Sequence, residues 1–148
     1  MSFLLACQLN DRFAAVASVT GSMTPQTYNA CNLVHPTPIM QIHGTADATV
    51  PYAGDPLWTL SINNVLQFWY EYNNCNSSPT TTPLPNINTV DGSTVELITY
   101  SGGDNGSSVE HYKVNGGGHE WPGVWGNMDI NASIEVWKFF SKYNLSDL

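Results

Sequence analysis

Two short, largely apolar segments constrain the fold of this chain more than any other feature of its sequence. They cover residues 14–19 and 38–44. Neither alternates strictly between apolar and polar residues, and such continuous runs are typical of parallel strands whose two faces are both covered. Each is followed by residues that favour turns, in residues 20–22 and 45–51. The two segments therefore predict inner strands of a mainly parallel sheet.

Helical patterns surround these strands. Residues 2–9 form an almost wholly apolar helix, which we expect to be buried on several sides. Ser61 is a suitable N-cap for a helix that ends near residues 73–74, and a last helix begins at about Asn131. The apolar positions are Ile62, Val65, Leu66, Trp69 and Tyr72 in the first of these helices, and Ile134, Trp137 and Phe140 in the second.

The segment between these two helices completes the pattern. Residues 76–93 are rich in Ser, Thr, Pro and Asn and predict an irregular connection. Residues 95–100 and 109–114 predict two strands of a hairpin, joined by the Gly-rich residues 101–108. The order of elements favours the α/β class, with a mainly parallel sheet and helices on both faces. We expect residues 1–148 to form one domain.

Composition limits the kinds of partner. The chain has 148 residues, a net charge of −8 and only four Lys and Arg residues, so we expect neither nucleic acid nor an anionic membrane as a partner. No apolar run approaches the roughly 20 residues that cross a bilayer. Three cysteines, Cys7, Cys31 and Cys75, allow at most one internal disulfide, and their spacing does not determine its pairing.

Polar residues gather in two segments that each follow a predicted strand, residues 44–51 and 116–123. In parallel sheets the carboxyl ends of the strands meet at one edge, where ligands bind. Asp47 lies in the first segment and His119 in the second. An aspartate that accepts the Nδ1 proton of a histidine leaves Nε2 free to act as a general base. The sequence therefore predicts an acid–base pair at this edge of the sheet.

Simpler interpretations remain open for both residues. Asp47, within Thr-Ala-Asp-Ala-Thr, has the sequence of a residue that stabilises a turn through its own backbone. His119 follows three glycines, which permit the close approach and unusual torsions of a tight loop, but it is also compatible with a purely structural loop histidine. Only the spatial relation between the two side chains separates these alternatives.

Other side chains have weaker signals. We expect His43, in the strand before Asp47, to be packed or hydrogen-bonded near the crevice, and we take it and Trp121 as the candidates for contact with a substrate. Trp121 is equally compatible with packing of its loop, and His35 and His111 have no companions that suggest a role. Metal-binding and phosphate-binding motifs are absent from the sequence, so we expect no metal and no cofactor.

Four stretches resemble the polyhydroxybutyrate depolymerase and feruloyl esterase family of secreted α/β-hydrolases. They are LLACQLNDRFAAVASVTGSM, PIMQIHGTADATVPY, VEHYKVNGGGHEWPG and NMDINASIEVWKFFSKY. The resemblance implies that the protein is a secreted carboxylic ester hydrolase acting through an acyl-enzyme, with Asp47 as triad acid and His119 as triad base. It also implies an aromatic-acid ester or a short hydroxyalkanoate polyester as substrate.

The sequence departs from this family in one respect that matters for chemistry. The resemblance implies a Gly-x-Ser-x-Gly motif just before residues 4–9, and no such motif occurs in the sequence. We therefore expect a partial α/β-hydrolase fold without its N-terminal strands and nucleophile elbow, from a truncated chain. Ser22 lacks the sharp turn and the aimed backbone donors that a substitute nucleophile needs. The alternative function is a non-catalytic remnant that binds a ligand or partner.

The missing strands also predict an exposed surface. In a complete member of the family, a further strand would flank residues 14–19, so here that strand is expected to have an unpaired apolar edge. We expect a second copy of the chain to cover this edge, which would make the protein a homo-oligomer, with a rearranged segment of the same chain as the alternative.

Overall fold

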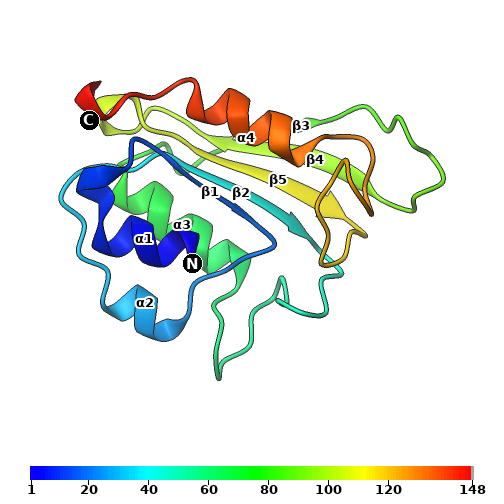
Figure 1. The fold of residues 1–148 in the computed structure, drawn as a ribbon, viewed down its shortest axis with the longest axis horizontal. Coiled ribbons are helices and arrows are strands. Elements are labelled where there is room, and N and C mark those ends of the chain that lie inside the picture. The colour runs from blue at the N-terminus through cyan, green and yellow to red at the C-terminus, as the bar shows by residue number, and fades with distance from the viewer. Residues whose placement is uncertain (148) are drawn as a thin grey trace.

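The computed structural model describes residues 1–147 and shows a mixed α/β fold built on one five-stranded sheet (Figure 1). The sheet order is β1-β2-β5-β4-β3. The pairings of β1 with β2 and of β2 with β5 are parallel, whereas β5 with β4 and β4 with β3 are antiparallel. The strands are β1 (Val16–Val19), β2 (Ile39–Gly44), β3 (Thr80–Pro83), β4 (Thr94–Tyr100) and β5 (Val109–Asn115).

The predicted α/β class is confirmed, but the sheet is mixed rather than mainly parallel. The hairpin of β4 and β5 forms as predicted, and β5 then pairs with β2 in parallel. The strand β3 lies within the connection for which the sequence predicted no regular structure. All four of its residues are exposed, so it has no apolar alternation that could reveal it.

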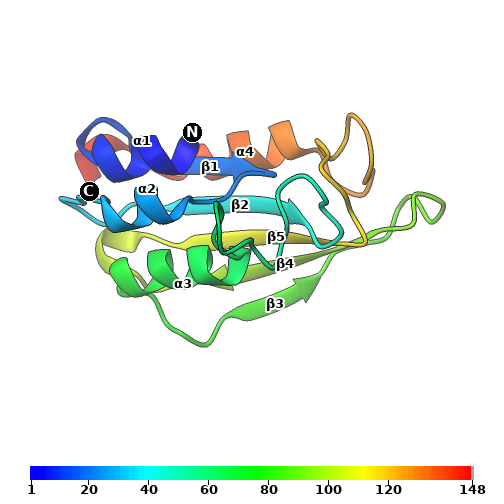
Figure 2. The ribbon, with the colours of Figure 1, turned by 90° about the horizontal axis from the view of Figure 1, so that it is seen from below.

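Helices cover both faces of the sheet, as expected. Figures 1 and 2 show α1, α2 and α3 on one face and α4 on the other. Ser61 caps α3 by accepting the N–H of Asn64, and Asn131 caps α4 by accepting the N–H of Ile134. The helices are α1 (Ser2–Gln8), α2 (Pro25–Asn29), α3 (Ile62–Tyr72) and α4 (Ala132–Phe140), with short 3₁₀ turns at Asn10–Arg12, Asp104–Gly106 and Leu145–Asp147.

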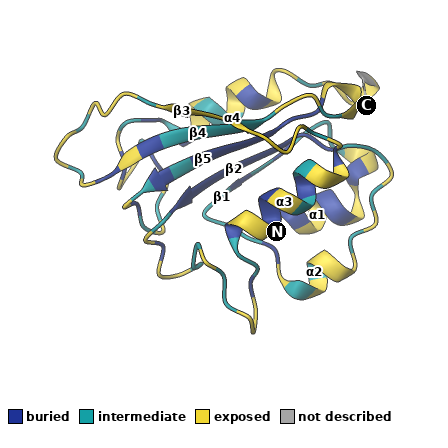
Figure 3. Cartoon of the chain, turned by 180° about the vertical axis from the view of Figure 1, so that it is seen from behind, coloured by how far each residue is buried: buried dark blue, intermediate teal, exposed yellow. Residues whose placement is uncertain are grey.

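The apolar core has one layer on each side of the sheet, and β2 is buried along its whole length (Figure 3). The first layer joins α1 and α3 to the sheet, and the second joins α4 to the opposite face. Their central residues are Phe3, Val16, Ile39, Ile62, Trp69 and Val109 in the first layer, and Met40, Ile42, Val95, Val114, Ala132 and Phe139 in the second.

One side of the described chain is more exposed than the sequence predicted. Within residues 1–147, β1 is an edge strand rather than an inner one. The helix α1 buries only one side, since Leu4 and Leu5 are exposed, and the side chain of Trp137 on α4 is also exposed. The inner position predicted for residues 14–19 and the burial of residues 2–9 on several sides were therefore wrong, whereas the unpaired edge expected for this strand is present within the described residues.

A disulfide joins Cys7 of α1 to Cys31, just after α2, and Cys75 is free. The two linked cysteines lie 24 residues apart in the sequence. Closing a loop of that length restricts the unfolded chain and stabilises the fold by about 3 kcal/mol. The disulfide therefore fixes α1, and with it the surface beside β1.

Candidate active site

The strands β2 and β5 lie side by side and parallel, so the loops that follow them leave the same edge of the sheet. Backbone hydrogen bonds hold these loops together: Thr45 donates to the carbonyl of Val114, and Ala46 donates to the carbonyl of Gly117, both at 2.9 Å. Gly44 makes this approach possible. A Cβ at Gly44 would lie 2.2 Å from the carbonyl oxygen of Gly117, which no side chain tolerates.

This contact brings the two predicted residues together. His119 Nδ1 lies 2.9 Å from Asp47 Oδ2. The predicted meeting of the two loops is confirmed. The other carboxylate oxygen, Oδ1, accepts the backbone N–H groups of Thr49 and Val50 at 2.8 Å each. Asp47 thus stabilises its own turn with one oxygen and contacts the histidine with the other, so the turn bonds and the contact that an acid–base pair requires are present together.

The two members of the pair differ in exposure. The Asp47 side chain is 0% exposed, whereas that of His119 is 41% exposed. An acceptor on Asp47 requires the proton of His119 to reside on Nδ1, which leaves the lone pair on Nε2. Within residues 1–147 this Nε2 has no hydrogen-bond partner. The arrangement is an exposed, oriented imidazole backed by a buried carboxylate.

His43 lies on the interior side of Asp47. Its Nε2 donates to the carbonyl of Val50 at 2.9 Å and lies 3.3 Å from Asp47 Oδ2, while Nδ1 accepts from the amide of Gln41. Burial lowers the pKa of His43, so the ring is neutral and its contact with Asp47 is not an ion pair. The side chain has no exposed surface, so the substrate contact expected of His43 would require this loop to open.

A second buried histidine, His111 on β5, supports the same loop, although no companion residue in the sequence suggested a role for it. Its Nδ1 donates to the carbonyl of Gln41 at 3.0 Å, and its Nε2 accepts from the Tyr52 hydroxyl at 2.8 Å. Burial lowers the pKa of His111 to about 4 and raises that of Tyr52 to about 12. Only the strand register, which pairs Gln41 with His111, indicates that His111 supports this loop.

The loop that carries His119 is held differently. The carboxylate of Glu120 accepts the backbone N–H of Gly118 through Oε2 and that of Asn127 through Oε1, at 3.0 and 2.8 Å. Gly116 has φ +81°, a conformation that favours glycine. Glu120 was not among the predicted residues, yet it closes the loop that presents the imidazole.

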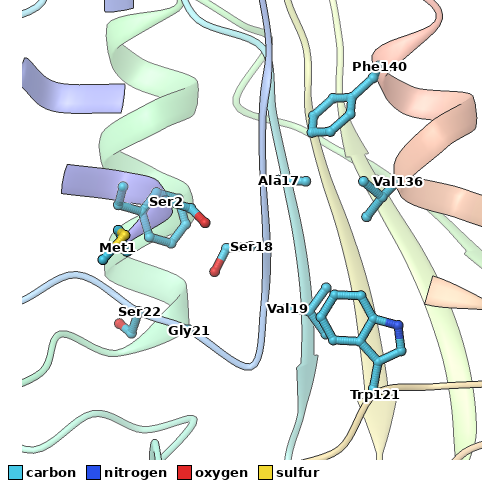
Figure 4. Close-up of a pocket in the computed structure, with 11 residues that line it drawn as sticks. Met1, Ser2, Ala17, Ser18, Val19, Gly21, Ser22, Trp121, Val136 and Phe140 are labelled. Carbon is cyan, nitrogen blue, oxygen red and sulfur yellow. The ribbon is translucent and has the colours of Figure 1, made fainter. Parts of the chain in front are cut away.

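Trp121, two residues after His119, lines a pocket of about 320 Å³ beside β1. Figure 4 shows Ser18 on the α1 side of β1, with Trp121, Val136 and Phe140 on the other side. Ser22 also lines this pocket, but its hydroxyl donates to the carbonyl of Leu60 at 2.7 Å. It therefore makes no hydrogen bond with His119.

In residues 1–147, no three His, Cys, Asp or Glu side chains are arranged to hold a metal ion. Across the same residues, none of the helices combines the length and apolar character needed to cross a membrane.

No known protein family matches the chain, and no curated protein resembles it significantly. The geometry of the site and the sequence motifs are thus the basis for any functional proposal.

Proposed function

We propose that this chain carries the acid and base of a serine-type carboxylic ester hydrolase with an α/β-hydrolase arrangement. The observation that carries the proposal is the 2.9 Å contact between His119 Nδ1 and the buried carboxylate of Asp47. These two residues follow neighbouring parallel strands, where catalytic side chains of open α/β sheets gather. A buried carboxylate behind an exposed imidazole is the arrangement that activates a hydroxyl nucleophile.

In the proposed reaction, His119 Nε2 removes the proton of a serine hydroxyl as that oxygen attacks the ester carbonyl. The imidazolium then gives this proton to the departing alkoxide, which leaves an acyl-enzyme that water hydrolyses by the same steps. Asp47 accepts the Nδ1–H throughout and stabilises the imidazolium. The N–H groups of Thr49 and Val50 keep the carboxylate in place.

The proposed nucleophile lies outside the 148 residues, in a segment that pairs with the outer edge of β1. Val16 and Thr20 donate their backbone N–H groups towards β2, so Ala17 and Val19 direct theirs to the open edge. The pocket lined by Ser18, Ser22 and Trp121 adjoins this edge. A strand there would bring a turn at its end close to the loop of His119.

The proposed substrate class is an aromatic-acid ester or a short hydroxyalkanoate polyester. The pocket beside β1 supports it because its lining includes the ring of Trp121 and the apolar side chains of Val19, Val136 and Phe140. Such a lining takes up an apolar acyl group. We also propose that the protein is secreted, since the Cys7–Cys31 disulfide persists in oxidising compartments.

The test uses the full reading frame of the gene and a fluorophosphonate probe, which labels activated serines. We expect labelling of a serine in a Gly-x-Ser-x-Gly sequence, and loss of labelling and of ester turnover in His119→Ala. The 148-residue chain alone should remain unlabelled. Labelling that persists in His119→Ala, or labelling of Ser22 in the short chain, would contradict the assignment.

A second candidate is a non-catalytic module that binds a partner, and the surface beside β1 favours it. Residues 13–19 contain no charged side chain that would block strand addition, and exposed apolar residues of α1 and α4 flank this edge. The occupant that we propose is a second copy of the chain, with the two β1 edges paired antiparallel. Light scattering after size exclusion should give a dimer, and a monomer at high concentration would refute it.

A further inference from the structure

The four histidines differ in whether a ring nitrogen is free to react. In three of them both ring nitrogens lie within hydrogen-bond distance of a polar atom, whereas in residues 1–147 His119 has such a neighbour only at Nδ1. His43 binds the side-chain amide of Gln41 and the carbonyl of Val50, and His111 binds the carbonyl of Gln41 and the hydroxyl of Tyr52. The ring nitrogens of His35 face the carbonyl oxygens of Pro36 and Asn10, and a neutral ring donates to only one of them.

We propose that His119 Nε2 is itself a nucleophile towards activated aryl esters, so that the 148-residue chain hydrolyses them without any serine. This activity goes beyond the proposed function, in which the same nitrogen only transfers protons. An imidazole attacks a carbonyl through an unprotonated nitrogen, and Asp47 keeps the proton of His119 on Nδ1. The reactive nitrogen is thereby fixed as Nε2.

The reaction has two balanced steps. In the first, the Nε2 lone pair bonds to the ester carbonyl carbon, the carbon–oxygen bond to the aryl group breaks, and the aryloxide leaves with the bonding electron pair. The resulting acyl-imidazolium retains its Nδ1–H, whose positive charge lies 2.9 Å from the Asp47 carboxylate. In the second step water attacks the acyl carbon, the carbon–nitrogen bond breaks, and the water protons pass to solvent.

Burial of the Asp47 carboxylate strengthens its stabilisation of the positively charged acyl-imidazolium. Asp47 is fully buried and held by two backbone N–H groups, so solvent screens its attraction for the imidazolium weakly. His119 remains accessible because its own side chain is partly exposed. Both ring nitrogens of His43 and of His111 are hydrogen-bonded, and each ring nitrogen of His35 faces a carbonyl oxygen, so His119 is the histidine whose second nitrogen is open to an ester.

The test follows 4-nitrophenolate release from 4-nitrophenyl acetate by the 148-residue chain at pH 7.5. Mass spectrometry of acid-quenched samples locates the acetyl group. We expect an acetyl adduct on the peptide that contains His119, and loss of the protein-dependent rate in His119→Ala. The matched control, His35→Gln, should keep that rate. Circular dichroism confirms that both variants fold.

The variant Asp47→Asn tests whether the reactivity of His119 depends on its contact with Asp47 or on its exposure alone. We expect the rate to fall roughly tenfold or more, because an amide no longer balances the imidazolium; the same change in a complete triad costs about 10⁴-fold. Nitrogen NMR of the unsubstituted protein gives a second readout that needs no variant: it should show His119 protonated on Nδ1 at neutral pH.

Three results would overturn the proposal: an unchanged rate in His119→Ala, acetyl groups only on lysines or the terminal amine, or a proton on His119 Nε2. The outcome is independent of the serine mechanism. Fluorophosphonate labelling of the full reading frame tests the serine, whereas acetylation of the short chain tests the imidazole.

Discussion

The two loops that form the Asp47–His119 pair are stabilised in opposite ways. The acid loop, residues 45–52, is anchored to the sheet interior by two neutral histidines: His43 binds the carbonyl of Val50, and His111 binds the hydroxyl of Tyr52. The base loop, residues 116–127, lies nearer the surface and is closed by glycine torsions and one carboxylate. One loop is fixed by buried groups and the other by local bonds.

This difference shows how an accessible base can still be oriented. An exposed imidazole exchanges hydrogen bonds with water and holds one orientation poorly by itself. Because Asp47 is buried and accepts two backbone N–H groups, a single hydrogen bond to it is enough to direct the ring of His119. The comparison predicts that changes in the acid loop or its anchors cost more than changes in the base loop.

The largest effect is expected where the two loops touch. In Gly44→Ala, the new methyl group would meet the backbone of Gly117 and Gly118 within 2.2 to 2.5 Å, so one loop must move. We expect a loss of about 3 kcal/mol in the free energy of unfolding, measured by urea denaturation. The His119 Nδ1 proton signal should also disappear. A variant of wild-type stability with an intact pair would show that the contact is not essential.

The two buried histidines that anchor the acid loop predict that the protein loses stability at low pH. His111 has a pKa of about 4 in the folded protein against 6.5 without the fold, so between these values the unfolded chain binds more protons. Stability is therefore fully present above pH 6.5 and falls as pH drops towards 4, by about 2 kcal/mol between pH 7.5 and 4.5. The lowered pKa of His43 acts in the same direction.

Urea midpoints at the two pH values measure this loss. The variant His111→Asn removes the titrating group, so its stability should change less with pH than that of the unsubstituted chain. Equal losses in both proteins would mean that other groups cause the acid sensitivity.

A smaller effect is expected in the base loop. Glu120→Gln keeps one acceptor oxygen and loses the charge that strengthens the bonds to Gly118 and Asn127, at a cost of about 1 kcal/mol. We expect faster hydrogen exchange at these two amides and unchanged exchange at Thr49 and Val50. Faster exchange in both loops alike would remove the distinction between them.

The smallest effect is expected at Gly118. A Cβ there meets only Glu120 Oε2, at 4.0 Å, so Gly118→Ala should alter stability by no more than about 0.5 kcal/mol. The change Gly116→Ala enforces φ +81° on a residue with a side chain and places the new methyl group 2.8 Å from the carbonyl oxygen of Gly92, so it should cost at least about 1 to 2 kcal/mol. Thermal unfolding of the two variants gives the comparison, and similar melting temperatures would refute it.

Much of the site follows from local sequence. The turn at Asp47 and the glycines before His119 are local patterns, and parallel strands place both at one edge of the sheet. The residues that support the site, Gly44 and His111, cannot be identified from local sequence patterns. Gly44 matters only because Gly117 lies against it, and His111 matters only because the register sets it beside Gln41. Neither neighbour can be inferred from spacing along the chain.

The α/β class, the helix cap at Ser61, the start of the last helix near Asn131 and the β4–β5 hairpin were predictable from the sequence, because periodicity and capping depend on neighbouring residues. The pairing of β3 with β4, the Cys7–Cys31 disulfide and the neutral state of the buried histidines follow only from the folded structure. These features depend on which distant segments meet and on how completely they exclude water, and the order of residues does not specify either.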